Sequence, residues 1–152
     1  MQTSLQEIAS KAKREKKYRF GHLYTMLNEI NLEDSWKYLN KSASYGVDRI
    51  SAKEYGRNLR INIKELVERL KRKNYRAKLV RRKYIPKPGG KERPLGIPAT
   101  EDKLVQLAVA RILNAIYEQD FLPYSYGYRN GRSAKMALKN SIINCNTAGM
   151  AM

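Results

Sequence analysis

Apolar residues recur at helical spacing in two long stretches of the chain. The first stretch follows Ser51-x-x-Glu54, the pattern of a helix capping box. The second follows Thr100, after which Glu101 and Asp102 supply negative charge to a first helical turn. In both stretches the apolar positions lie three or four residues apart: Tyr55, Leu59, Ile63, Leu66 and Leu70, then Leu104, Ala108, Ile112 and Ala115, with Val105 and Ile116 beside them. This spacing predicts two long helices.

Weaker patterns predict shorter helices towards both ends of the chain. Residues 5–20 form either a helix or a basic arm, because six of them are Lys or Arg. Residues 22–40 predict one or two short helices, the second capped by Asn31. The side chains expected to pack from this second helix are Leu32, Trp36 and Leu39. Ser133 is expected to cap a last helix that continues to about Ile143.

A different pattern separates the two long helices, where residues 84–98 read "YIPKPGGKERPLGIP". Prolines fix φ and remove N–H donors, whereas glycines permit positive φ. With β-branched and aromatic residues on either side, this composition predicts a stiff β-hairpin. Its strands are expected at 79–85 and 94–98, with Pro-Gly-Gly at the tip. The elements are thus helical, then one hairpin, then helical, and the predicted fold class is α+β and helix-rich.

The charge of the chain indicates its partner. The sequence holds 31 Lys and Arg against 14 Asp and Glu, a formal net charge of +17. Such an excess favours a polyanion as the partner, most often nucleic acid, with an anionic membrane surface as the alternative.

No run of 18 apolar residues predicts a membrane span, and the N-terminus lacks the features of a secretory signal. The single cysteine, Cys145, excludes an internal disulfide, and we expect a cytoplasmic protein.

The positive charge is densest at residues 71–93, where eleven Lys or Arg stand against one acid, Glu92. Lys87, Lys91 and Arg93 surround the Pro-Gly-Gly tip. A rigid tip would hold these cations at set positions, which suits a phosphate ligand. The alternative is a solvated basic face without a ligand.

Three further cations, Arg81, Arg82 and Lys83, lead into the hairpin. Side chains alternate between the two faces of a strand. Arg81 and Lys83 are therefore expected on one face, and Arg82 on the other together with Tyr84. One side of the hairpin is expected to contact a nucleic-acid backbone.

Aromatic residues alternate with arginines in "FLPYSYGYRNGRS" (121–133). Tyr126 and Tyr128 suit stacking on bases, and Arg129 and Arg132 suit contact with phosphates. The alternative is a turn packed by tyrosines, with solvated arginines.

Candidates for catalysis and metal binding are few. The adjacent acids Glu33-Asp34 and Glu101-Asp102 are both expected at helix starts, where the macrodipole accounts for them. His22 is the only histidine, so no histidine-based metal cluster is expected. The sequence therefore indicates groups that hold anions, without a catalytic residue or a metal site.

Three segments together resemble the N-terminal motifs of group II intron-encoded reverse transcriptase/maturases. They are "YGVDRIS" (45–51), "YIPKPGGKERPLGIPATEDKLVQLAV" (84–109) and "FLPYSYGYRNGRSAKMAL" (121–138), in the order that the family has. The resemblance spans roughly residues 20 to 140. It implies the fingers, with the start of the palm, of an RNA-directed DNA polymerase from a mobile element.

The resemblance also implies roles for individual residues. Lys87 and Arg93 match positions that contact the triphosphate of an incoming dNTP. Arg81 and Ile97 match positions that support the template, and residues 126–132 match a motif along the template–primer path. The N-terminal helices resemble an extension that binds intron RNA.

The sequence departs from the family at several points. "GVDR" stands where the family usually has "GVDG", and "YRNGRS" where it has "FRPGRS". The strand with a catalytic Asp and the later Tyr-x-Asp-Asp turn have no counterpart. We therefore expect a truncated polymerase chain that is inactive alone, without a cofactor of its own. Mg²⁺ is expected for the complete enzyme.

Four regions are expected: a helical basic extension (1–44), fingers (45–120) with the hairpin at 79–98, the start of the palm (121–143) and an atypical tail (144–152). The alternative function is a self-contained, non-enzymatic RNA-binding module. The identity of the RNA and dimerisation stay open.

Overall fold

The fold is organised around α5 (Thr100–Tyr117), the longest helix. The structure is a computed structural model, and it describes residues 4–140. The apolar stripe predicted for α5 faces the core, where Leu104, Ala108 and Ile112 are buried. The prediction of this helix from its stripe is confirmed.

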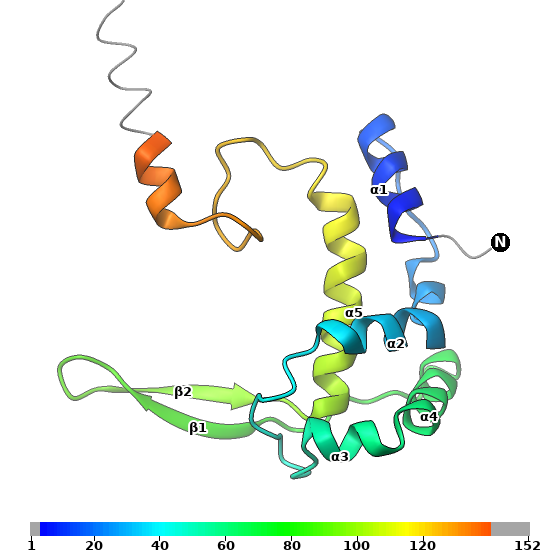
Figure 1. Cartoon of the computed structure of the whole chain (residues 1–152), viewed down its shortest axis with the longest axis vertical. Coiled ribbons are helices and arrows are strands. Elements are labelled where there is room, and N and C mark those ends of the chain that lie inside the picture. The colour runs from blue at the N-terminus through cyan, green and yellow to red at the C-terminus, as the bar shows by residue number, and fades with distance from the viewer. Residues whose placement is uncertain (1–3, 141–152) are drawn as a thin grey trace, which may run out of the picture.

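Two shorter helices pack on α5. α1 (Leu5–Arg14) runs beside it, and α2 (Glu29–Tyr38) crosses it (Figure 1). Ile8 from α1, and Leu32 and Trp36 from α2, enter the core cluster. α1 ends before the predicted helix does, and the basic residues that follow it lie in a loop.

The start of α2 differs from the prediction. Its N-cap is Asn28, whose side chain accepts a hydrogen bond from the backbone N–H of Asn31 at 3.0 Å. Asn31 is therefore not the cap, and Glu33 and Asp34 lie inside the helix instead of at its start. A short 3₁₀ helix, η1 (Leu23–Met26), precedes α2.

The first long apolar stripe forms two helices instead of one. α3 (Ala52–Arg57) starts at the predicted capping box, in which Ser51 and Glu54 exchange side-chain and backbone hydrogen bonds. The chain leaves helical geometry at Asn58, with φ −119° and ψ 37°, and resumes as α4 (Leu59–Lys71). The stripe keeps its periodicity across this break, so the pattern alone did not reveal it.

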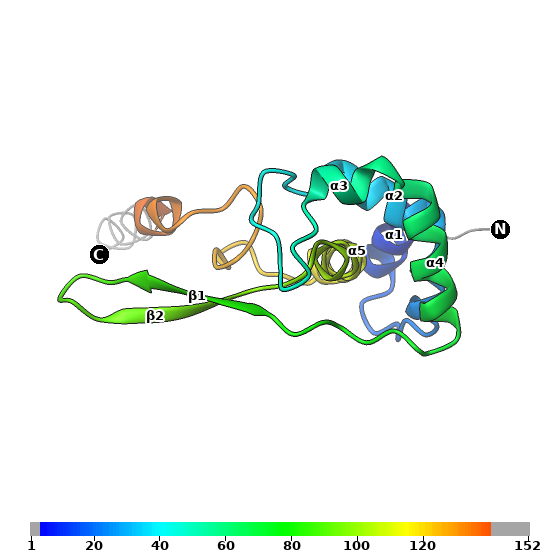
Figure 2. The same cartoon turned by 90° about the horizontal axis from the view of Figure 1, so that it is seen from below.

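The hairpin consists of β1 (Arg81–Pro86) and β2 (Glu92–Ile97), which pair antiparallel. Its existence is confirmed, although each strand starts two residues, and ends one residue, away from its predicted bounds. Gly89 and Gly90 at the tip have φ of 85° and 75°, which a residue without Cβ adopts readily. The hairpin projects away from the helical body (Figures 1 and 2).

After α5 the chain forms turns and then a helical segment at 134–140, drawn in orange in Figure 1. The Ser133 hydroxyl accepts a hydrogen bond from the backbone N–H of Met136 at 3.2 Å, as expected of a cap. The continuation of this helix to Ile143, the tail at 144–152 and Cys145 lie outside the described residues. Among residues 4–140 no helix is long and apolar enough to cross a membrane.

Candidate nucleic-acid interface

The register of the hairpin separates its cations between two faces. Arg81 lies opposite Ile97, Lys83 opposite Leu95, and Ile85 opposite Arg93. Directly opposed residues share a face of a sheet. Arg81, Lys83 and Arg93 therefore lie on one face, and Arg82 and Tyr84 on the other, as the alternation predicted.

The tip continues this arrangement. The backbone N–H of Lys87 donates to the carbonyl of Lys91 at 2.7 Å, which extends the ladder by one pair beyond β1 and β2. By alternation, both lysines belong to the face of Arg93. We call the five cations Arg81, Lys83, Lys87, Lys91 and Arg93 the cationic face.

This face lacks compensating charge within the described part of the chain. None of Lys83, Lys87, Lys91 and Arg93 has an ion-pair partner among residues 4–140. The acid of the hairpin, Glu92, lies opposite Pro86 on the other face. Like charges facing each other across two strands destabilise the pair. A bound anion would remove this repulsion, so the face is suited to phosphate.

The root of the hairpin is held by a loop that is distant in sequence, residues 44–50, which we call the root loop. Arg81 Nε donates to the carbonyl oxygen of Tyr45 at 3.1 Å, and its guanidinium carbon lies 4.5 Å from the centre of the Tyr45 ring. Lys78 and Asp48 form an ion pair at 3.0 Å, in which the Asp48 side chain is largely buried. Arg81 is therefore fixed at the root, whereas the other cations of the face are exposed.

The same loop is tied to the start of α5. The Thr100 hydroxyl donates to the carbonyl of Ile50 at 2.6 Å, and Lys103 Nζ donates to the carbonyl of Ser44. Gly46 packs so closely that a Cβ there would lie 2.5 Å from the backbone N and Cα of Ala99. Only glycine allows this approach of the two backbones.

The buried residue Asp102 also helps to anchor the hairpin to α5. This carboxylate is 2% exposed and accepts hydrogen bonds from the Tyr75 hydroxyl and, at 3.0 Å, from the backbone N–H of Lys78. Burial, and then the hydrogen bond to Asp102, raises the pKa of Tyr75, so its phenol remains a donor. The helix macrodipole was an incomplete explanation of this acid, because Asp102 joins α5 to the segment that enters the hairpin.

Neighbouring Glu101 also has a specific partner. It pairs with Arg69 of α4 at 2.6 Å. The predicted pair of acids at this helix start therefore serves packing between elements.

One departure from the family pattern falls at a position whose backbone favours glycine, Arg49. Its φ is 58°, in the left-handed region that favours glycine. The usual "GVDG" would meet this requirement without strain, whereas "GVDR" places an exposed arginine there.

The second predicted contact segment, 121–133, is held together by Arg129. The Arg129 side chain is 7% exposed, pairs with Glu118 at 2.5 Å and donates to the carbonyls of Leu122 and Ser125. Hydrogen bonds from Arg129 lower the pKa of Glu118. In this arrangement the Arg129 guanidinium is used within the chain and is not presented to a ligand.

The remaining residues of this segment differ in exposure. Arg132 donates to the carbonyl of Pro123 at 2.9 Å and lies 5.3 Å from the ring centre of Tyr126. Tyr128 is fully exposed and has a φ of 56°. Tyr128 is therefore the most exposed aromatic ring of this segment, followed by Tyr124.

The other departure from the family pattern falls in the turn that carries Arg132. The backbone N–H of Arg132 donates to the carbonyl of Arg129 at 3.2 Å, and Gly131 has a φ of 70°. A positive φ at the third residue is typical of a type II turn, in which proline suits the second position. Asn130 occupies that position here, so the turn persists without the proline.

The structure does not bring the two predicted contact segments together. The hairpin leaves from the N-terminal end of α5, and residues 121–140 follow its C-terminal end (Figure 1). Both project to the same side of this helix (Figures 1 and 2).

Residues 4–140 do not fit a two-metal site. They contain no group of three or more His, Cys, Asp or Glu that could hold a metal ion. The acids Asp48, Glu101 and Asp102 are engaged as described above. Asp34 pairs with Arg111 at 2.6 Å, and the hydrogen bond from Arg111 lowers the pKa of Asp34. No catalytic step is therefore assigned to a metal here.

Comparisons with known proteins find relatives for part of the chain. Group II intron-encoded protein LtrA from Lactococcus lactis subsp. cremoris is 49% identical over 78 residues, which are 51% of this chain and 13% of LtrA. Protein YkfC from Escherichia coli K12 is 39% identical over 94 residues, which are 62% of this chain and 25% of YkfC.

A protein from the cob intron of Schizosaccharomyces pombe, described as an uncharacterized 91 kDa protein, is 39% identical over 82 residues, 54% of this chain and 10% of its own length. No family model matches the chain. The chain thus has homologues among group II intron-encoded proteins, and it spans a quarter or less of the length of these relatives.

Replacing Gly46 tests the anchor of the hairpin. Gly46→Ala would place a Cβ against the backbone of Ala99, so the root loop must move. We expect the free energy of unfolding to fall by about 1–3 kcal/mol, as in other overpacked sites. Urea denaturation followed by circular dichroism measures it.

The matched control is Gly127→Ala, where a Cβ would meet no atom within 4 Å. We expect this change to stay within about 0.5 kcal/mol. Equal effects of the two substitutions would contradict the close packing of the root loop.

Proposed function

We propose that this chain forms the part of a group II intron-type RNA-directed DNA polymerase that binds RNA and the triphosphate of the incoming dNTP. The observation that carries the proposal is the cationic face, which combines five cations on one side of a hairpin with a fixed root. Homology to group II intron-encoded proteins supports the same conclusion. In this proposal residues 45–120 are fingers and 121–143 begin the palm.

We assign a ligand to each cation from its position along the hairpin. Lys87, Lys91 and Arg93 lie at and next to the tip, where no side chain of the helical body covers them. We assign these three to the triphosphate. Arg81 lies at the root opposite Ile97, which is 8% exposed. We assign this pair to the support of the template.

The remaining candidates are assigned to RNA. Lys83 shares the cationic face, whereas Arg82 contacts RNA only if the strand passes the opposite face. In the segment after α5, Tyr128 would stack on a base and Arg132 would contact phosphate. Arg129 would contribute to RNA binding indirectly, because its hydrogen bonds hold the loop that starts after α5 in place.

Polymerisation itself needs carboxylates that hold two Mg²⁺ ions. Since residues 4–140 do not fit such a site, the role proposed for them is binding alone. A self-contained RNA-binding module would share the RNA contacts but would not need the triphosphate contacts.

Two adjacent residues test which face of the hairpin contacts RNA. Each phosphate that a cation neutralises contributes about −0.7 to the slope of log K against log salt for single strands. We expect Lys83→Gln to make the slope shallower by about this amount. Arg82→Gln removes the same charge from the opposite face and is expected to leave the slope nearly unchanged. Fluorescence anisotropy with a labelled RNA over a salt series measures both.

Equal losses of slope from the two substitutions would show that the hairpin attracts RNA without a preferred face. Absence of RNA binding near 0.1 M salt would contradict the proposed function.

Arg93 tests the triphosphate contact. Arginine can engage two phosphate oxygens at once, and lysine cannot reproduce this geometry. In a full-length active relative that carries this hairpin, Arg93→Ala should raise the KM for nucleotide and lower kcat/KM about ten- to a hundredfold. Arg93→Lys should recover only part of the loss. Steady-state kinetics at saturating template measures this.

An unchanged KM for nucleotide together with weakened template binding would favour the RNA-binding module instead.

A further inference from the structure

Arg49 in the root loop has a backbone conformation that disfavours an arginine. Its φ of 58° lies in the left-handed region, where the Cβ of an ordinary residue crowds the carbonyl oxygen that follows it. Glycine avoids this strain, and the family pattern "GVDG" has glycine where this chain has "GVDR". Strained residues of this kind are frequent at ligand-binding sites, where the side chain has a use that offsets the strain.

The neighbours of Arg49 hold its backbone in this conformation. Its N–H donates to the carbonyl of Gly46 at 3.3 Å, and the next N–H, that of Ile50, donates to the Asp48 carboxylate at 3.2 Å. That carboxylate also forms the ion pair at the hairpin root, and the Ile50 carbonyl is hydrogen-bonded to the start of α5. The loop cannot relax without losing these contacts, so the strain depends on which residue occupies position 49.

The Arg49 side chain is the cation of the root loop, and it is exposed. No ion pair joins it to another residue within the range 4–140. The cations that approach the root loop from other elements are Lys78, Arg81 and Lys103, and each is bonded to that loop. Arg49 therefore remains available to an external anion.

Two acids close to Arg49 in sequence have other partners. Asp48 pairs with Lys78 and is largely buried. Glu54 accepts hydrogen bonds from the backbone N–H and the hydroxyl of Ser51. Neither acid forms an ion pair with Arg49, so the guanidinium keeps its full charge towards solvent.

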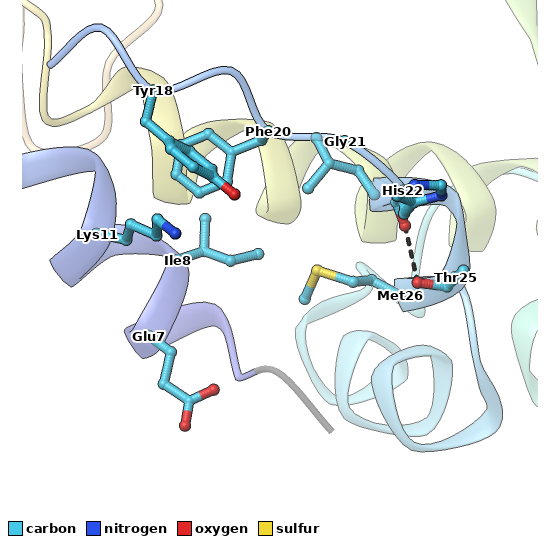
Figure 3. Close-up of a pocket in the computed structure, with 10 residues that line it drawn as sticks. Glu7, Ile8, Lys11, Tyr18, Phe20, Gly21, His22, Thr25 and Met26 are labelled. Carbon is cyan, nitrogen blue, oxygen red and sulfur yellow. Dashed lines mark hydrogen bonds between the residues drawn. The ribbon is translucent and has the colours of Figure 1, made fainter. Parts of the chain in front are cut away.

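The pocket between α1 and residues 18–26 shows no such excess of one charge. Glu7 and Lys11 both line it, together with the apolar side chains of Ile8 and Met26 (Figure 3). A pocket with one acid and one base does not select an anion by charge. The root loop is in this respect the better candidate for a phosphate.

We propose that Arg49 binds a phosphate of an RNA strand that lies along the cationic face, so that the contact surface continues past the hairpin root onto the root loop. The hydrogen bond from Arg81 to this loop places the loop at the root end of the face. A strand advances about 3.3 Å per residue, so Lys87 at the tip lies roughly 20 Å from Arg81. A triphosphate held at the tip is too short to span this distance, whereas a polymer of phosphates reaches both ends. The inference rests on the proposed RNA binding and adds a contact that the glycine of the family pattern cannot make.

The test combines RNA binding with stability in variants of position 49. Arg49→Gly and Arg49→Asn both remove the charge, and both new residues tolerate positive φ. In fluorescence anisotropy with a labelled single-stranded RNA, we expect either change to make the slope of log K against log salt shallower by about 0.7. In urea denaturation we expect the midpoint to rise, because the strain is relieved. Arg49→Lys keeps both charge and strain, so it should retain most of the slope and the midpoint of the wild-type chain.

The matched control is Arg60→Gln, which removes another exposed arginine without an ion-pair partner among residues 4–140, at the start of α4. We expect it to leave the slope nearly unchanged, whereas Lys83→Gln reports binding by the hairpin independently of the root loop. A slope that both Arg49→Gly and Arg49→Asn leave unchanged, or that Arg60→Gln reduces equally, would overturn the contact of Arg49.

The stability readout separates this contact from a structural role of Arg49. If both uncharged variants lowered the urea midpoint, Arg49 would be stabilising the loop, and the inference would be wrong. In either case a slope that still responds to Lys83→Gln would leave the proposed function standing. Absence of RNA binding by the wild-type chain would contradict the proposed function itself.

Discussion

The anchoring of the hairpin root is the constraint on which the candidate interface depends. An isolated two-stranded hairpin is marginally stable in water, and this one buries little besides Ile97. Its orientation comes from Asp102, which ties the segment before β1 to α5, and from the root loop, which joins Arg81 to the start of α5. Without these contacts the cations at the tip would have no fixed position relative to the helical body.

Electrostatic repulsion within the cationic face opposes the anchoring of the hairpin. Like charges lie next to one another on the hairpin, and the described residues supply no acid on the same face. Three acids outside the hairpin, Asp34, Asp48 and Glu101, each pair with a cation elsewhere in the fold. These acids hold elements together and leave the charge of the hairpin uncompensated. A phosphate ligand would offset the repulsion, which links binding to stability.

Local patterns predicted much of the fold. The stripes of α4 and α5, the capping box at Ser51 and the alternation of faces in the hairpin follow from spacing alone, because helices and strands have fixed periods. Contacts between distant segments were not predictable in this way. Nothing in the sequence signals that Gly46 meets Ala99, that Asp102 binds Tyr75 or that Arg129 is buried against Glu118. The break at Asn58 was missed because the stripe continues across it.

The most direct test of the account is whether RNA covers the cationic face in particular. Acetylation of lysines, followed by mass spectrometry, compares their reactivity with and without a single-stranded RNA. Lys83, Lys87 and Lys91 are exposed, as are Lys53 on α3 and Lys64 on α4. We predict that RNA protects the three hairpin lysines severalfold and leaves Lys53 and Lys64 as reactive as before. Equal protection of all five lysines would contradict the claim, because it would show attraction by net charge without a defined face.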